Sequence, residues 1–95
     1  MQLQITGHGL EITPALRELT EKKLRRIQSH FDHITNIHIT FAVNKQRQIA
    51  EGNIQVPGTT INAQAESHDM YKSVDLLMEK LMTQLTKHKE KIKNR

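Results

Sequence analysis

The 95-residue sequence contains no cysteine and no tryptophan, and aromatic residues make up only 3% of it. Without cysteine, disulfides, thiolate metal sites and cysteine nucleophiles are excluded. No apolar run approaches the roughly 18 residues that a membrane-spanning helix needs. The opening residues, MQLQITG, lack the charged and apolar segments of a secretory signal peptide. These absences favour a cytoplasmic protein that does not act at a membrane, and the length suits one domain over residues 1–95.

A catalytic set is also missing. Asp75 and Glu79 lie four residues apart on a predicted helix, but nothing indicates that they share a proton in a cleft. His30 and His33 have a spacing that can hold a metal, yet no third ligand is near them in the sequence. There is no glycine-rich phosphate loop. We therefore predict a non-enzymatic protein with no catalytic residues, no metal, no cofactor and no small-molecule substrate.

The periodicity of apolar residues predicts a strand followed by a helix in the first third of the chain. Leu3 and Ile5 alternate with polar residues, as in a half-buried strand. Thr13 is a favourable N-cap, and Pro14 is preferred at the first helical position. Apolar residues then recur at helical spacing, which predicts a helix over residues 14–30.

From residue 34 the apolar period changes to two, which indicates strands. The polar segment 44–48 is predicted to be a loop, and Pro57-Gly58 a turn. We therefore expect three strands that form an antiparallel meander between residues 34 and 66, the last of them over residues 60–66. Asp69 is a plausible N-cap for a final helix that reaches about residue 93.

The element order predicts an α+β fold of the type β-α-β-β-β-α. One face of the strands carries mostly Gln, Asn, Thr and His, so that face can stay in water while helices cover the other. A right-handed crossover makes the first two strands parallel. We therefore expect a two-layer α/β sandwich: a four-stranded mixed sheet with two parallel helices packed on one face.

Basic residues are concentrated on the two predicted helices. Fourteen Lys and Arg against ten Asp and Glu give a net charge of +4. At about 100° per residue, one side of the last helix carries a basic and polar stripe, and Lys89 lies off that stripe. The candidate RNA-binding residues are Lys22, Lys23, Arg25, Arg26, Lys80, Gln84, Lys87, Lys89 and Lys91.

Because the helices are predicted to be parallel, we expect the two basic stripes to form one electropositive face above the sheet. Lysines late in a helix also complement its dipole, and charged helix faces are often only solvated. The segregation of acids to the other side favours a binding surface. Several cations that neutralise phosphates give strong, salt-dependent affinity, and structured RNA is recognised largely by shape and backbone. Phe31 and Phe41 fall in core phase and Tyr71 at the core edge, so stacking rings on the open sheet are not expected.

Four segments together resemble the ribosome hibernation promoting factor family, and the resemblance covers the whole chain. They are Ile5-Thr6-Gly7, the segment 11–17 (EITPALR), Asp69-Met70-Tyr71, and the lysine-rich run over residues 80–91. The resemblance implies a bacterial, cytoplasmic factor of stationary phase or stress. Such a factor binds the small ribosomal subunit in the channel for messenger and transfer RNA, contacts 16S rRNA and inhibits translation. The family's basic helix residues correspond here to Lys22, Lys23, Arg26, Lys80, Lys87 and Lys91.

The chain ends at Arg95, directly after the last predicted helix, which resembles the short form of this family. Short forms are expected to act with a separate ribosome modulation factor to promote dormant ribosome dimers. The related protein Y has an additional tail and opposes dimerisation, so a protein Y-like stabiliser of inactive monomeric ribosomes is the alternative. A general structured-RNA-binding module, or a protein that acts on the transcription machinery, also remains open.

Overall fold

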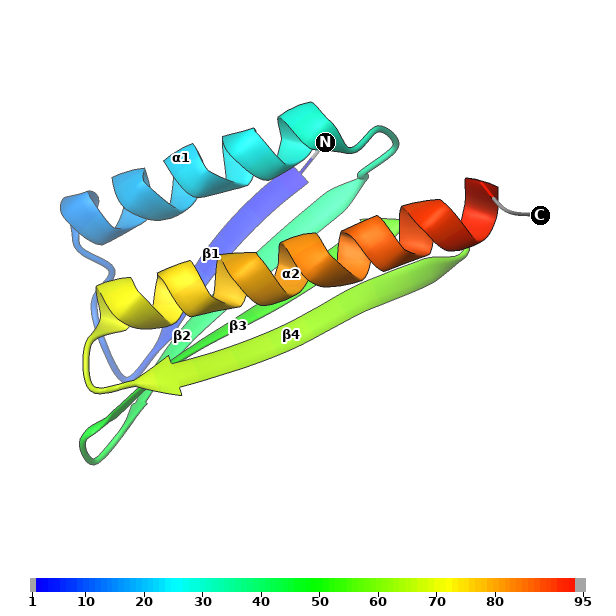
Figure 1. The fold of residues 1–95 in the computed structure, drawn as a ribbon. Coiled ribbons are helices and arrows are strands. Elements are labelled where there is room, and N and C mark those ends of the chain that lie inside the picture. The colour runs from blue at the N-terminus through cyan, green and yellow to red at the C-terminus, as the bar shows by residue number, and fades with distance from the viewer. Residues whose placement is uncertain (1, 94–95) are drawn as a thin grey trace.

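Figure 1 shows six elements in the predicted order β-α-β-β-β-α. The computed structural model describes residues 2–93, and in the last helix it describes side chains as far as residue 91. The elements are β1 (Gln2–His8), α1 (Pro14–His30), β2 (Asn36–Asn44), β3 (Arg47–Val56), β4 (Thr59–Ser67) and α2 (Met70–Lys93). The predicted fold class is confirmed.

Both helices begin where local capping groups were predicted. The Thr13 hydroxyl accepts a hydrogen bond from the Leu16 N–H at 3.1 Å, and Pro14 occupies the first turn of α1. The Asp69 carboxylate accepts from the Tyr71 N–H at 3.0 Å at the start of α2. Each cap satisfies an N–H that has no partner inside its helix. The residue at which each helix begins is therefore marked by a capping group that the local sequence supplies.

The four strands lie in the order β1-β2-β3-β4, with β1 parallel to β2 and the other pairs antiparallel. Pro57 and Gly58 form the β3–β4 turn as predicted, and Gly58 adopts a φ of 87°, which suits a residue without a side chain. The predicted loop over residues 44–48 is wrong. Only residues 45 and 46 form the turn, because Asn44 already pairs with Arg47 across the hairpin.

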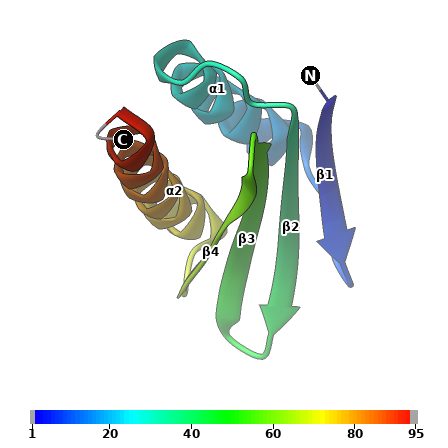
Figure 2. The same cartoon turned by 90° about the vertical axis from the view of Figure 1, so that its right-hand side faces the viewer.

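Both helices cover the same face of the sheet and leave the other face open (Figure 2). They lie side by side and run in the same direction, as predicted (Figure 1). α2 packs on β3 and β4, and α1 lies over the part of the sheet formed by β1 and β2. Within the described residues, no helix is both long enough and apolar enough to cross a bilayer.

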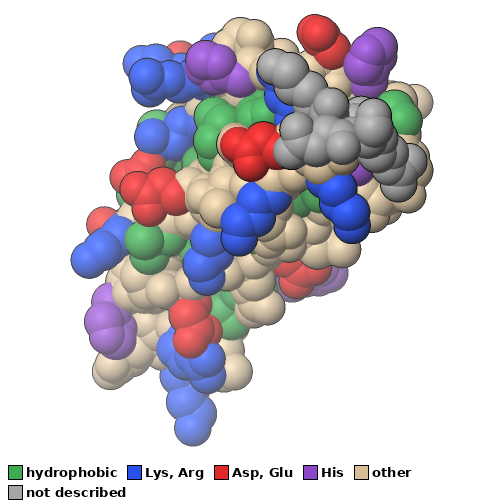
Figure 3. All heavy atoms as spheres, turned by 45° about the vertical axis from the view of Figure 1, so that its right-hand side comes forward, with side chains coloured by type: hydrophobic (Ala, Val, Ile, Leu, Met, Phe, Trp, Pro, Cys, Tyr) green, Lys and Arg blue, Asp and Glu red, His purple; other side chains and the backbone are tan. Residues whose placement is uncertain are grey.

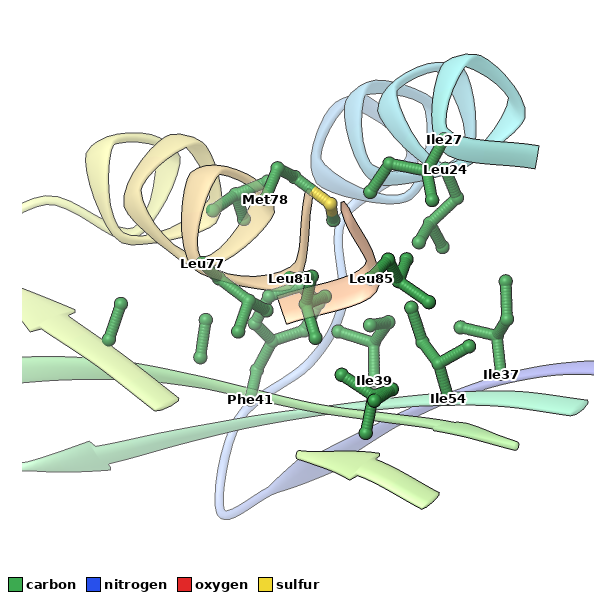
Figure 4. Packing of buried hydrophobic residues seen from close by; sticks show 14 of the residues in the cluster. Leu24, Ile27, Ile37, Ile39, Phe41, Ile54, Leu77, Met78, Leu81 and Leu85 are labelled. Atoms are coloured by element: carbon green, nitrogen blue, oxygen red, sulfur yellow. The ribbon is translucent and has the colours of Figure 1, made fainter. Parts of the chain in front are cut away.

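The core fills the space between the helices and the sheet (Figure 4). The predicted apolar stripe of α2 is buried through Leu85, whereas the side chain of Ile92 lies outside the described part. Phe41 is fully buried at the centre of the sheet. Tyr71, expected at the core edge, is 44% exposed in the first turn of α2. The largest fully buried apolar residues are Phe41, Leu24, Ile27, Ile37, Ile39, Ile54, Leu77, Leu81, Leu85 and Val74.

Candidate nucleic-acid interface

The basic stripe of α2 lies along the β4 edge of the sheet. We call Lys80, Gln84, Lys87 and Lys91 the α2 ridge. The Lys80 ammonium donates to the Gln64 carbonyl at 2.7 Å, and the Gln84 amide donates to the Asn62 carbonyl at 2.8 Å. Both acceptors belong to β4, which has a neighbouring strand on one side only. The α2 ridge therefore faces away from α1.

The lysines of the α2 ridge carry uncompensated charge. Lys80, Lys87 and Lys91 are exposed. Among the described residues, no ion pair joins any of them to Asp or Glu. The bond from Lys80 to a neutral carbonyl orients its ammonium but leaves its charge available. Figure 3 shows Lys and Arg side chains spread along this side of the molecule, with acidic side chains between them. The α2 ridge can therefore neutralise phosphates over several helical turns.

A groove of mixed charge separates the two helices. Lys23 and Arg26 of α1 line one wall, and Asp75 and Glu79 of α2 line the other. Lys23 and Asp75 form an ion pair with an N–O distance of 2.7 Å. Both side chains are partly exposed, at 34% and 57%, so this pair adds little to stability. It does reduce the charge that Lys23 can offer to a polyanion.

The prediction of one continuous electropositive face is wrong. The basic stripes occupy similar angular positions on two parallel helices, as predicted, so they point in the same direction in space. Because the helices lie side by side, Lys23 and Arg26 of α1 point into the groove, whereas Lys80 and Gln84 of α2 point outward over β4. Asp75 and Glu79 therefore lie between the two stripes.

The remaining predicted residues lie at separate places. Lys22 and Arg25 are exposed on α1 and take part in no ion pair within the described residues. The Lys89 ammonium lies 5.8 Å from the centre of the Phe31 ring, a cation–π arrangement at the far end of α2. His30 lines the groove between the helices, whereas His33 lies in the following loop. No group of three or more potential metal ligands occurs among the described residues.

Sequence reasoning did not identify Arg47 as a neighbour of the α2 ridge. Arg47 shares a surface hollow with Lys80 and Gln64. Its guanidinium donates to both carboxylate oxygens of Glu66, at 2.6 Å each from Nη2 and 3.0 Å from Nε. These hydrogen bonds, together with the attraction of the carboxylate, raise the pKa of Arg47 above its ordinary value. Arg47 stays protonated, but its charge is balanced by Glu66. No local signal in the sequence joins these two residues.

The whole chain has relatives among known proteins. Residues 3–93 match the family model described as "Sigma 54 modulation protein / S30EA ribosomal protein". The chain is 48% identical to the ribosome hibernation promoting factor of Klebsiella oxytoca, over 98% of each chain. It is 43% identical to the protein of the same name from Escherichia coli K12, again over 98% of each.

Two solved structures share the fold. A ribosomal subunit interface protein from Coxiella burnetii has 63% sequence identity and a TM-score of 0.90, over 95% of this chain and 99% of that one. The N-terminal domain of protein Y from Thermus thermophilus has 28% identity and a TM-score of 0.83, over 93% and 99% respectively. Both likenesses cover more than nine tenths of this chain.

Proposed function

Since this chain belongs to the Sigma 54 modulation protein / S30EA ribosomal protein family, we propose that it is a ribosome hibernation factor. In this proposal it binds the small ribosomal subunit through 16S rRNA, in the channel for messenger and transfer RNA, and inhibits translation. It acts in the bacterial cytoplasm during stationary phase or stress. The family assignment confirms the prediction of a non-enzymatic binding protein.

The proposal is supported above all by the lysines of the α2 ridge, none of which forms an ion pair within the described residues. Lys80, Lys87 and Lys91 follow one another at intervals of seven and four residues, so they recur on one side of a helix. Each phosphate that they neutralise releases a condensed counterion, which gives sequence-independent affinity for RNA. Lysine carries no code for reading base edges in a folded RNA. A surface of this kind suits rRNA, whose fold presents a fixed arrangement of phosphates.

The basic residues of α1 are assigned a secondary role in this proposal. Lys22 and Arg25 are exposed and contribute charge directly. Lys23 and Arg26 lie in the groove opposite Asp75 and Glu79, so their contribution is reduced by these acids. In this proposal the chain, residues 1–95, is one ribosome-binding domain in which the α2 ridge makes the main contact.

The effect on ribosome assembly is part of the same proposal. We infer that the protein promotes dormant ribosome dimers together with a ribosome modulation factor. This is supported by relatives named ribosome hibernation promoting factor at 43–48% identity, against 28% for the protein Y domain. Deletion in stationary-phase cells should then remove the dimer peak from a sucrose gradient. An unchanged dimer peak with fewer inactive monomers would instead support a protein Y-like role.

Reversing the charge of the α2 ridge tests the central claim. Replacing Lys80, Lys87 and Lys91 together with Glu should abolish co-sedimentation with small ribosomal subunits, with an unchanged circular dichroism spectrum. A matched control replaces Arg17, Lys45 and Lys72 with Glu, because these residues are exposed and lie outside the α2 ridge. The control should retain binding. Equal loss in both variants would show that net charge alone controls binding, and retained binding in the first would reject the proposal.

A general structured-RNA-binding module is the second candidate, and the predominance of lysine in the α2 ridge favours it, because phosphate contacts carry no sequence information. The two candidates differ in selectivity. A hibernation factor should bind small subunits much more tightly than an arbitrary RNA duplex at the same salt concentration. Equal affinity for the two would support the general module.

A further inference from the structure

A small apolar hollow lies where α1 ends and α2 runs past the β3–β4 turn, at the right-hand end of the molecule in Figure 1. Its volume is about 340 Å³, at the small end of the roughly 300–1,000 Å³ usual for ligand pockets. Four apolar residues form its walls, one each from α2, the end of β3, the β3–β4 turn and the segment after α1. They are Phe31, Val56, Pro57 and Leu85, and the polar lining residues are Asp32, His33, His88 and Lys89.

The segment beside this hollow contains a residue in the left-handed backbone region. α1 ends at His30, and Phe31 is extended, which turns its ring toward the end of α2. His33 adopts a φ of 70°, in the left-handed region that L-residues other than glycine rarely occupy.

The chemistry around the hollow combines an aromatic wall, an unsatisfied nitrogen and cations. The Lys89 ammonium lies 5.8 Å from the centre of the Phe31 ring. His88 Nε2 is buried and has no hydrogen-bond partner among the described residues. Lys91 follows His88 by three residues, so it is a neighbour of His88 on the helix surface. Lys91 belongs to the α2 ridge, which connects the hollow to the proposed phosphate-binding surface.

We propose that this hollow accepts one unstacked nucleobase of an RNA strand bound along the α2 ridge. The inference rests on the proposed function, and it adds a base-binding site to a surface otherwise built for phosphates. A nucleobase has two flat apolar faces for Phe31 and Pro57, and a polar edge for the polar side chains of the lining. Its phosphates would lie beside Lys89 and Lys91. Bases that unstack onto protein rings are a common mode of RNA recognition.

The first test compares a nucleotide with its base-free counterpart by NMR. AMP should shift the resonances of Phe31, Leu85 and His88 in the unmodified protein, whereas ribose 5-phosphate should shift only lysine resonances. Val56→Phe fills the hollow without changing the charge and should remove the shifts at these three residues. Val43→Phe is the matched control, because Val43 is 42% exposed at the opposite end of the sheet. It should behave as the unmodified protein does.

The second test needs no protein variant, so it holds even if Val56→Phe fails to fold. A single-stranded oligoribonucleotide is titrated against the unmodified protein, with an abasic site placed at each position in turn. One position should weaken binding by roughly five- to one-hundredfold, the range expected for the loss of one stacked base. The intact oligoribonucleotide should bind more tightly than AMP, because its phosphates also contact the α2 ridge.

Three outcomes would overturn the inference: no shifts at Phe31 and Leu85 with either ligand, equal shifts with ribose 5-phosphate, or equal affinity at every abasic position. Concentration-dependent shifts in the hollow without RNA would overturn it too, since they would identify a second copy of the chain as the occupant. In each case, retained co-sedimentation of the unmodified protein with small subunits leaves the proposed function standing. Failure of the proposed function is recognised separately, by ribosome binding that survives the triple glutamate substitution.

Discussion

At the scale of single residues, Ser73 joins three elements. It is fully buried in the first turn of α2. Its hydroxyl lies 2.7 Å from the Gln48 carbonyl in β3 and 2.8 Å from the Ser67 hydroxyl at the end of β4. A third contact, at 3.2 Å, is the carbonyl of Asp69, the residue before α2. This single polar group therefore fixes the start of α2 on the sheet.

We predict that Ser73→Ala lowers the free energy of unfolding by about 1–3 kcal/mol, because the Gln48 carbonyl and the Ser67 hydroxyl lose a buried partner. Equilibrium denaturation in urea measures the change. Ser29→Ala is the control, since the Ser29 hydroxyl donates to the Arg26 carbonyl at an exposed site. That variant should stay within about 0.5 kcal/mol of the unmodified protein. Similar effects in both variants would contradict the role given to Ser73.

Asp75 restrains Lys23 across the groove between the helices. We predict that Asp75→Asn strengthens binding to small ribosomal subunits by several-fold at low salt, because Lys23 is released and one negative charge is removed. Stability should change by less than about 1 kcal/mol, as for other exposed ion pairs. Affinity measured by sedimentation at two salt concentrations tests this.

Glu11→Gln provides the matched control for Asp75→Asn. Glu11 is exposed in the segment between β1 and α1, and it forms no ion pair among the described residues. The control also removes one negative charge, but at a position outside both helices. If it strengthens binding as much as Asp75→Asn does, the effect comes from net charge, and Lys23 has no special part in it.

At the scale of elements, Gly52 sets the distance between α2 and the sheet. A Cβ atom at this position of β3 would lie 3.0 Å from Leu81 Cδ1 and 3.2 Å from Ile39 Cδ1. Both methyl groups belong to fully buried core residues. Glycine therefore leaves room beside β3 for the side chain of Leu81, which Figure 4 shows pointing from α2 toward the sheet.

We predict that Gly52→Ala destabilises the protein by about 1–3 kcal/mol through overpacking. Thermal or urea unfolding measures the loss. The double variant Gly52→Ala, Leu81→Val should be less destabilised than the sum of the two single changes, because the smaller side chain makes room for the added methyl group. Strict additivity would show that the two positions do not compete for the same space.

The elements also show what a sequence can and cannot predict. Thr13 and Asp69 indicated the helix starts correctly because capping involves residues two or three positions apart. The loop predicted over residues 44–48 was wrong because strand pairing at the end of a hairpin depends on backbone bonds, which leave no apolar pattern. Arg47 pairs with Glu66, nineteen residues away, and no local pattern reveals such a contact.

In the candidate site, too, contacts between residues that are distant in the sequence could not be predicted. The angular position of each basic residue on its own helix could be predicted, because it depends only on helical geometry. The surroundings of each basic residue in the folded protein could not be predicted. The pairing of Lys23 with Asp75, and the contact of Lys80 with β4, depend on how far apart the two helices lie on the sheet. That spacing is set by core side chains such as Leu24 and Leu81, which are distant in the sequence.

At the scale of the whole molecule, the uneven distribution of the +4 net charge predicts a measurable salt dependence. Replacing Lys80, Lys87 and Lys91 with Gln should reduce the slope of log affinity against log salt by about 2–3, because each lost phosphate contact removes roughly 0.7–0.9. Titrations with small ribosomal subunits between 50 and 200 mM salt would measure the slope. Gln at positions 17, 45 and 72 should leave it nearly unchanged. A similar decrease in both variants would mean that the phosphates are not contacted by the α2 ridge in particular.

The contacts from α2 to the edge of β4 also bear on how the molecule behaves when it is abundant. An open strand edge invites pairing with another chain. Here the outward carbonyls of Asn62 and Gln64 are already occupied by the side chains of Gln84 and Lys80. A second molecule that approached this edge would have to displace both donors and bring its backbone close to a line of positive charge. The residues proposed to hold RNA thus also protect the protein against self-assembly while no RNA is bound.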